Sequence, residues 1–194
     1  WTQDEFQAFL ECVADKPISY YAFEMLYWTG IREGELLALT PADFNFEKKT
    51  LRINKSYQRL EGKDVITDPK TPKSNRTIVM PDFLAVEMED FISSLYGIKD
   101  DDRIFTISKS YLHHEMDRGA KLAGVKRIRI HGLRHSHISL LIDLGFSALA
   151  ICERVGHEAV DITYHYAHLF PTVQTDMAAQ LETEREALVN VRKE

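Results

Sequence analysis

The sequence predicts an α+β fold that is mainly helical and contains one small antiparallel sheet. Stretches with apolar residues at helical spacing fill both ends of the 194-residue chain. Short runs rich in β-branched residues are confined to residues 50–80, between turn-forming residues. Glycine follows several of the helical stretches directly, at Gly30, Gly124, Gly145 and Gly156. A left-handed glycine is a common helix end, so these positions separate one expected helix from the next.

The first two helices have clear boundaries. Thr2 can accept a hydrogen bond from the amide of Glu5, whose carboxylate can reach back to the Thr2 amide, as in a capping box. A second helix is expected over residues 18–29 and should end at Gly30. A short helix should follow through residues 36–37.

The middle of the chain is expected to form the sheet. Residues 50–53, 64–66 and 76–80 read as three strands of one antiparallel sheet, with turns at Gly62 and at residues 69–72. The remainder is expected to be helical, over residues 82–96, 108–122, 131–144, 147–155, 160–168 and 171–191. No internal repeat or linker interrupts the pattern, which favours a single domain over residues 1–194.

The charge of the chain is unevenly distributed. Its formal net charge is -6, which argues against a uniformly basic DNA-binding module. Nevertheless, residues 118–134 carry six basic side chains and no acidic one, and a second basic group precedes residue 77. A surface with separate basic and acidic faces can bind DNA on one side. The basic residues expected to contact DNA are Arg76, Lys121, Lys126, Arg127 and Arg129.

Two further observations concern the cellular compartment of the protein. The longest apolar runs fall short of the roughly 18 residues of a membrane span, so no membrane association is expected. Cys12 and Cys152 lack the spacing of a disulfide framework or a metal site, which fits a reducing cytoplasm.

Arg32 is the first candidate for binding a phosphate. It follows a glycine turn and opens a helix, where backbone amides already favour an anion. Glu35, three residues later, can hold the guanidinium in place. An exposed Arg–Glu pair without function is the alternative for this position taken alone.

His131 and Arg134 form the second candidate pair. They are one helical turn apart and therefore share a face, so they can reach two oxygens of one phosphate. A buried structural histidine beside a surface arginine is the competing interpretation.

The C-terminal part adds a histidine and a tyrosine. His157 follows Gly156 at a turn, and Tyr166 lies nine residues further on. Tyrosine can attack phosphorus covalently, although its ordinary pKa of about 10 makes it a weak nucleophile without help. Lys70 and Lys73 lie on the expected hairpin, where a lysine can protonate a departing alkoxide.

Together these stretches resemble the tyrosine recombinase, or phage integrase, family. The resemblance rests on five segments in the family's order: WTQDEFQAFL, TGIREGELLAL, PKTPKSNRTIVM, HGLRHSHISLLIDLG and VGHEAVDITYHYAHLFP. It implies the catalytic-domain fold of that family, and DNA cutting and rejoining through a 3′-phosphotyrosine without metal, cofactor or ATP.

The resemblance also implies roles for individual residues. Arg32 and Arg134 would clamp the scissile phosphate, and His131 would be the general base or proton relay. His157 would hydrogen-bond the phosphate, and Tyr166 would be the nucleophile. The general acid would be Lys70, with Lys73 as the alternative because the length of the hairpin leaves the register open.

Further implications concern the partners. The substrates would be double-stranded DNA attachment sites, and the protein would act in the bacterial cytoplasm, on the nucleoid. Core-binding and arm-binding domains would precede a catalytic domain of this kind, and neither is expected within this chain. Four copies would assemble through the final helix, although the isolated domain can be a monomer.

Two other functions remain open at this point. A metal-dependent nuclease or hydrolase could use the histidines, because His131 and His135 have a zinc-compatible spacing. However, there is no HExxH motif and no cysteine pair. A catalytically silent DNA-binding relative is the second alternative.

Overall fold

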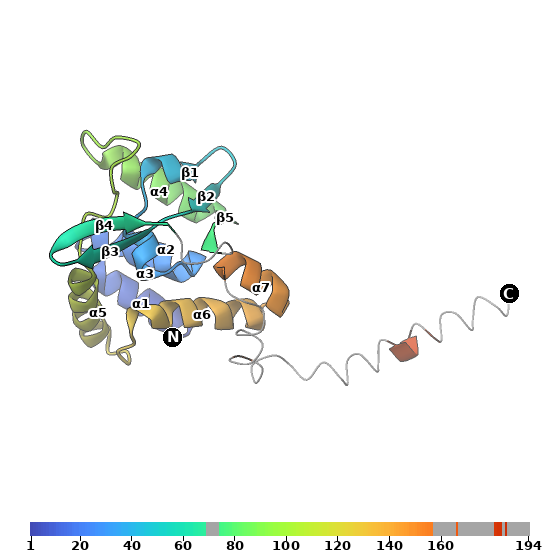
Figure 1. Cartoon of the computed structure of the whole chain (residues 1–194). Helices are drawn as coiled ribbons and strands as arrows, with labels where there is room; N and C mark the ends of the chain where they lie inside the picture. The colour runs from blue at the N-terminus through green and yellow to red at the C-terminus, as the bar shows by residue number, and fades with distance from the viewer. Residues whose placement is uncertain (69–73, 157–165, 167–180, 184, 186–194) are drawn as a thin grey trace.

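The residues that the structure describes (1–68, 74–156, 166, 181–183 and 185) form helices, a short sheet and a separate hairpin at the edge of the molecule (Figure 1). The structure is a computed structural model. The α-helices are α1 (Gln3–Val13), α2 (Pro17–Thr29), α3 (Glu33–Leu36), α4 (Asp82–Ser94), α5 (Lys109–Ala123), α6 (Ile130–Asp143) and α7 (Ala148–Val155), with a 3-10 turn at Pro41–Asp43. The strands are β1 (Phe44–Asn45), β2 (Thr50–Ile53), β3 (Ser56–Leu60), β4 (Lys63–Thr67) and β5 (Arg76–Val79). The helices expected at residues 160–168 and 171–191 lie largely outside the described residues.

A three-stranded antiparallel sheet is present as predicted, but one of its strands differs. Its order is β1-β2-β5, whereas β4, the expected strand at residues 64–66, pairs with β3 in a hairpin of its own. Glu61 and Gly62 connect these two strands with φ angles of 50° and 79°. Two left-handed residues in succession suit a tight hairpin turn, so β4 folds back on its immediate neighbour rather than joining β2.

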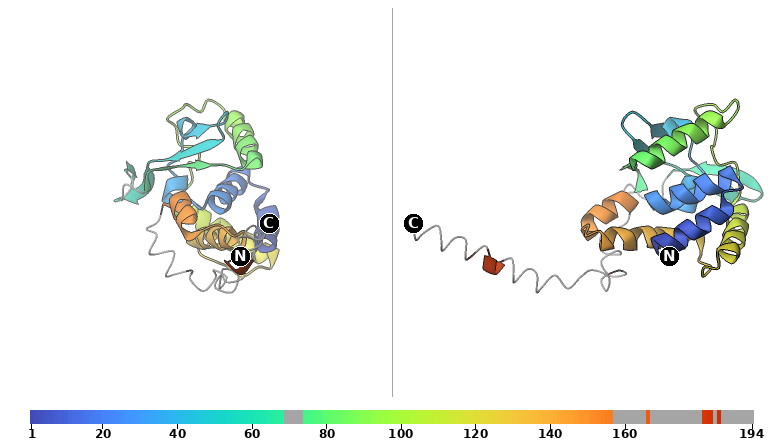
Figure 2. Two further views of the ribbon diagram at one scale, coloured as in Figure 1. Left: turned by 90° about the vertical axis from the view of Figure 1, so that its right-hand side faces the viewer. Right: turned by 180° about the vertical axis from the view of Figure 1, so that it is seen from behind.

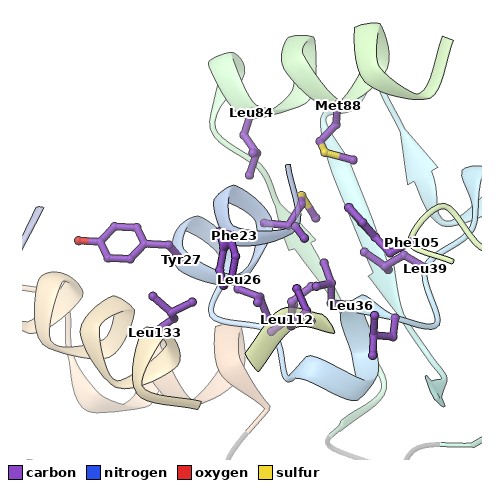
Figure 3. Close-up of a cluster of buried hydrophobic side chains, with 14 of the residues drawn as sticks. Phe23, Leu26, Tyr27, Leu36, Leu39, Leu84, Met88, Phe105, Leu112 and Leu133 are labelled. Atoms are coloured by element: carbon purple, nitrogen blue, oxygen red, sulfur yellow. The ribbon is translucent and has the colours of Figure 1, made fainter. Parts of the chain in front are cut away.

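The core is centred on α2. Figure 3 shows Phe23 and Leu26 of this helix facing Leu84 and Met88 from α4 on one side and Leu133 from α6 on the other. All five side chains are buried. Helix α4 lies across one face of the three-stranded sheet (Figure 2). The sheet and α6 are thereby fixed on opposite sides of α2.

Helix ends follow the predicted signals. The Thr2 hydroxyl accepts from the Glu5 amide at 3.2 Å, and the Glu5 carboxylate accepts from the Thr2 amide at 2.8 Å, which confirms the capping box. Gly30 ends α2 with a φ of 66°, and a Cβ at this position would lie 2.5 Å from Cδ2 of His137. Both the backbone conformation and this close approach require glycine. The turn that precedes Arg32 is therefore held against α6.

A second apolar cluster joins α6 to α7. Ile138 and Ile142 of α6 pack with Ile151 and Val155 of α7, and Tyr166 belongs to the same cluster, with 7% of its surface exposed. Burying an aromatic ring among aliphatic side chains fixes its position. Within the described part of the chain, no helix is both long enough and apolar enough to cross a lipid bilayer.

Candidate active site

Arg32 is positioned by Glu35. Arg32 caps α3, where its amide donates to Glu35 Oε2 at 2.8 Å and its Nη1 donates to Glu35 Oε1 at 2.8 Å. The contact predicted from the spacing is therefore present. Glu35 is 5% exposed, whereas the Arg32 side chain remains 35% exposed. The guanidinium is thus anchored on one side and open to solvent on the other.

Arg134 is a buried cation in the middle of α6. Its Nη1 donates to the Gly30 carbonyl and its Nη2 to the Val155 carbonyl, both at 2.6 Å, and only 1% of the residue is exposed. Among the described residues, its Nε has no hydrogen-bond partner. Burial, and then the charge of Arg32, lower the pKa of Arg134. A nearby anion would relieve both effects.

The two arginines meet at the C-terminal end of α7. Arg134 binds the carbonyl of Val155, and Arg32 Nη2 donates at 3.2 Å to the carbonyl of the next residue, Gly156. Helix C-termini leave such carbonyls without intrahelical partners. One turn of backbone therefore holds two guanidiniums side by side, although they lie 102 positions apart in the sequence. Such a pair can bind two oxygens of one phosphate.

Arg76 differs from the prediction. It was expected at the DNA surface, but it is only 9% exposed, and its Nη1 and Nη2 donate to Glu35 at 3.1 and 2.9 Å. Its Nε donates to the Arg154 carbonyl at 2.9 Å. The buried carboxylate of Glu35 attracts this side chain inward from β5, so Arg76 is a positioning residue that holds Glu35. Glu35 pairs with two guanidiniums, those of Arg32 and Arg76, and the buried Arg134 adds a third positive charge nearby, so positive charge exceeds negative charge among these four residues.

Two histidines and the tyrosine form a row beside the arginines. The rings of His131 and His135 meet edge to face, with centroids 4.9 Å apart, and the His135 and Tyr166 rings are 5.8 Å apart. Nδ1 of His135 is in hydrogen-bond contact with Oη of Tyr166. Burial raises the pKa of Tyr166, and the charge of Arg134 partly offsets this. The pKa of His131 is lowered, first by burial and then by His135, Arg134 and Arg32.

His137 does not belong to this row. It is 3% exposed, packs against Gly30, and its Nε2 accepts from Arg154 Nε at 3.1 Å. Burial, and then the charge of Arg154, lower its pKa to about 3, so it is neutral and structural at pH 7. Within the described part of the chain, His, Cys, Asp and Glu side chains form no group of three or more suited to a metal ion.

The remaining predicted residues lie at the surface or outside the described ranges. Lys121, Lys126, Arg127 and Arg129 are exposed around the α5–α6 connection, and Arg127 pairs with Asp117 at 2.7 Å. Lys70, Lys73 and His157 lie outside the described residues. Gly156, whose carbonyl Arg32 contacts, directly precedes His157 in the sequence.

Sequence reasoning missed two residues of the site. His135, which contacts Tyr166, was placed on the helix face of His131 and Arg134 but was given a role only as a possible metal ligand. Arg154 was not singled out. Its guanidinium donates to the Val79 carbonyl at 3.0 Å and the Trp28 carbonyl at 3.2 Å, which ties α7 to β5 and α2. No sequence signal separates Arg154 from an ordinary basic residue in a last helical turn.

The fold of this chain, with paired arginines beside a buried tyrosine, is that of a known family of proteins. The chain belongs to the phage integrase family, whose family model matches residues 1–172. It is 30% identical over 197 residues to the ICEBs1 integrase of Bacillus subtilis, covering 94% of this chain and 54% of that protein. It is 30% identical over 179 residues to the integrase of Staphylococcus phage L54a, covering 83% of this chain and 51% of that protein. The chain thus spans about half the length of these curated relatives.

Solved structures share the fold. The integrase of the Tn1549 transposon, in complex with a circular intermediate DNA, superposes with a TM-score of 0.76 at 22% identity, covering 95% of this chain and 65% of that one. The catalytic domain of bacteriophage HP1 integrase gives a TM-score of 0.65 at 20% identity, covering 93% of this chain and 92% of that one. The predicted fold class, that of a tyrosine recombinase catalytic domain, is confirmed.

Proposed function

We propose that this chain is the catalytic domain of an integrase that cuts and rejoins DNA strands in site-specific recombination. Membership of the phage integrase family supports the class of reaction. The observation that carries the chemistry is the convergence of Arg32 and Arg134 on successive carbonyls of one turn, beside the buried Tyr166. A nucleophile can attack the phosphodiester, and two fixed cations can stabilise the negative charge of the transition state.

The proposed reaction conserves the energy of the broken bond. Oη of Tyr166 attacks phosphorus, the P–O5′ bond breaks, and a 3′-phosphotyrosine and a 5′-hydroxyl result. The transition state carries extra negative charge, which the preorganised guanidiniums of Arg32 and Arg134 stabilise. The reverse attack by a 5′-hydroxyl, from the same or another duplex, reseals the strand. Neither a metal ion nor ATP takes part in this scheme.

The other proposed roles come from the family resemblance. His157 donates a hydrogen bond to the scissile phosphate, and His131 relays protons at the site. Lys70, or else Lys73, protonates the departing 5′-oxygen. A 5′-thio leaving group needs no proton, so it should restore cleavage to the variant that lacks the acid. Rescue of Lys70→Ala assigns the acid to Lys70, and rescue of Lys73→Ala assigns it to Lys73.

The proposed partners are double-stranded attachment sites and further copies of the chain. The exposed basic side chains around the α5–α6 connection, Lys121, Lys126, Arg127 and Arg129, supply phosphate contacts on the DNA. The solved XerH recombinase bound to its difH substrate shares the fold at a TM-score of 0.68, which is compatible with this mode of action. Four copies would join through the segment at residues 172–190, in the cytoplasm, when the protein acts on two duplexes.

Covalent trapping tests this proposal. The protein is incubated in EDTA with a nicked DNA duplex whose short 5′-hydroxyl fragment diffuses away after cleavage, and the adduct is mapped by mass spectrometry. An adduct on Tyr166 in wild type, and none in Tyr166→Phe, is expected. Cleavage without an adduct, dependent on added zinc or magnesium, would instead indicate a metal-dependent nuclease. DNA binding without cleavage under either condition would indicate a silent relative.

A further inference from the structure

The C-terminal turn of α7 accepts hydrogen bonds from three arginines at three successive carbonyls. The three donors come from different elements, namely β5, α6 and the start of α3. They are Arg76 to the Arg154 carbonyl at 2.9 Å, Arg134 to the Val155 carbonyl at 2.6 Å, and Arg32 to the Gly156 carbonyl at 3.2 Å. The position of this one turn therefore sets the spacing of the two arginines that are proposed to bind the phosphate.

The side chain of Arg154 holds this turn against the rest of the protein. Its Nη1 donates to the Val79 carbonyl of β5 at 3.0 Å, its Nη2 to the Trp28 carbonyl of α2 at 3.2 Å, and its Nε to His137 Nε2 of α6 at 3.1 Å. Each nitrogen of the guanidinium thus contacts a different element. A rigid, planar guanidinium can hold three acceptors at once, whereas the compact ammonium group of a lysine lacks this geometry.

Two arginines bridge the C-terminal ends of α2 and α7. Arg134 binds the carbonyl of Gly30, which ends α2, and the carbonyl of Val155, which ends α7. Arg154 belongs to α7 and binds the carbonyl of Trp28 in the last turn of α2. Carbonyls at helix C-termini lack intrahelical partners and carry partial negative charge, so cations hold two such ends together. Arg154 thereby fixes the separation that Arg134 spans.

We propose that Arg154 is a positioning residue for strand cleavage, which acts through the last turn of α7 on Arg32 and Arg134. The inference rests on the proposed function, because it concerns the rate of that same reaction. In this scheme Arg154 does not touch the DNA, since each of its side-chain nitrogens donates to an acceptor within the protein. Loss of these three bonds lets the turn shift, and the guanidiniums that it spaces shift with it.

Two substitutions at Arg154 test the requirement for its geometry. Arg154→Met keeps an unbranched apolar chain of similar length and removes all three donors. Misplacement of a site by about 1 Å can cost about 10²-fold in rate, so we expect adduct formation at saturating nicked duplex to slow by about 10–10²-fold. The duplex concentration that gives half of the maximal rate should stay close to that of wild type. A loss confined to this concentration, with the wild-type rate at saturation, would contradict a positioning role.

Arg154→Lys is the milder variant, because it keeps the positive charge without the fork. We expect it to be slow as well, since one ammonium group cannot hold the acceptors on α2, β5 and α6 together. The wild-type rate in Arg154→Lys would show that charge alone suffices, and the geometric role would then be wrong.

A stability control separates positioning from loss of fold. Leu112→Ala removes buried atoms of α5 from the core cluster around α2 (Figure 3), whereas α7 belongs to the second apolar cluster. Such a change lowers the melting temperature without touching α7. All variants are assayed well below their melting temperatures, and Leu112→Ala should then retain the wild-type rate of adduct formation. A rate loss as large as that of Arg154→Met would attribute the effect to stability and overturn the proposal.

A double-mutant cycle identifies the residue through which Arg154 acts. Single-turnover rates of adduct formation are measured for wild type, Arg154→Met, Arg32→Ala and the double variant. Residues that share a partner give non-additive losses, whereas independent sites give losses that multiply. We expect the loss caused by Arg154→Met to be about threefold smaller, or more, in the Arg32→Ala background than in wild type.

The outcomes distinguish this inference from the proposed function. Equal fold-losses in the two backgrounds, or the wild-type rate in Arg154→Met, would overturn the role of Arg154 and leave the recombination reaction intact. Failure of wild type to form any adduct in EDTA would overturn the proposed function instead.

Discussion

Glu35 and Arg76 form a buried, two-pronged ion pair between α3 and β5. Arg76 Nη1 lies 3.1 Å from Glu35 Oε1, and Arg76 Nη2 lies 2.9 Å from Glu35 Oε2. The same carboxylate holds the guanidinium of Arg32. Desolvation alone would raise the pKa of Glu35, but Arg76 and Arg32 overcome it and hold the pKa below its ordinary value. Strand β5 is thereby connected to Arg32, one of the two arginines proposed to bind the phosphate.

Arg76→Ala should be strongly destabilising. Removing one partner of a buried ion pair costs about 3–5 kcal/mol, because the other charge stays buried. We expect a fall of this order in the free energy of unfolding, measured with urea. Arg127→Ala is the matched control: it breaks an exposed pair with Asp117, which is worth about 1 kcal/mol or less. Equal effects of the two substitutions would contradict the buried position of Arg76.

DNA affinity should depend on the exposed basic residues and not on the buried Arg76. Lys126 is exposed, so Lys126→Ala should lower the slope of log affinity against log salt by about 1, the signature of one lost phosphate contact. Arg76 has its donors directed into the protein, so a folded Arg76→Lys variant should retain the wild-type slope. Fluorescence anisotropy over a salt series measures both slopes. A reduced slope for Arg76→Lys would indicate that Arg76 contacts the DNA, as the sequence predicted.

Arg32 and Arg134, the two arginines proposed to bind the phosphate, should differ in their effect on stability. Removing one transition-state donor costs about 10²–10³-fold in rate, so both Arg32→Ala and Arg134→Ala should lose cleavage to at least this extent. Arg134 also bridges α6 to Gly30 and Val155, and hydrogen bonds made by a charged group contribute about 1.5–3 kcal/mol each. Arg134→Ala should therefore melt at a clearly lower temperature than Arg32→Ala. Identical melting temperatures would argue against the buried bridge.

Gly30→Ala should disrupt the clamp without touching any charged residue. The new methyl group would meet the His137 ring at 2.5 Å on a backbone with a φ of 66°. Either His137 or the turn must move, and the turn carries Arg32 and the carbonyl that Arg134 binds. We expect lower thermal stability and slower covalent adduct formation. Gly62→Ala is the control, because it also has a positive φ but no atom within 4 Å of the added Cβ.

Glu24 should make stability depend on pH. Burial, and then the charge of Glu87, raise the pKa of Glu24 to about 7, from 4.5. The folded state therefore binds this proton more tightly than the unfolded state does. The stabilisation that this proton contributes is fully present below pH 4.5 and is lost as the pH rises through about 7. The change is up to about 3 kcal/mol, at 1.36 kcal/mol for each pKa unit. Urea titrations from pH 5 to 8 should show the fall, and Glu24→Gln should flatten it.

The sequence alone predicted the features that depend on interactions between residues close together in the chain. The capping box at Thr2, the glycine ends at Gly30 and Gly156, and the helical periodicity depend on residues a few positions apart, so the sequence reveals them directly. Spacing of three and four residues also placed Glu35 against Arg32, and His131 on the face of Arg134. The family resemblance selected the same residues by their motifs.

Long-range pairing was decided only by the tertiary structure. The turn at Gly62 was predicted from the sequence, but the strand with which β4 pairs depends on competition between adjacent and distant strands. From the sequence, Arg76 could not be distinguished from other basic residues near a turn. Its ion pair with the buried Glu35 is seen only in the structure. Likewise, the contact of His135 with Tyr166 joins residues 31 positions apart, so the sequence did not reveal it. Burial and partners determine what a charged or titratable side chain does, and both arise from contacts distant in sequence.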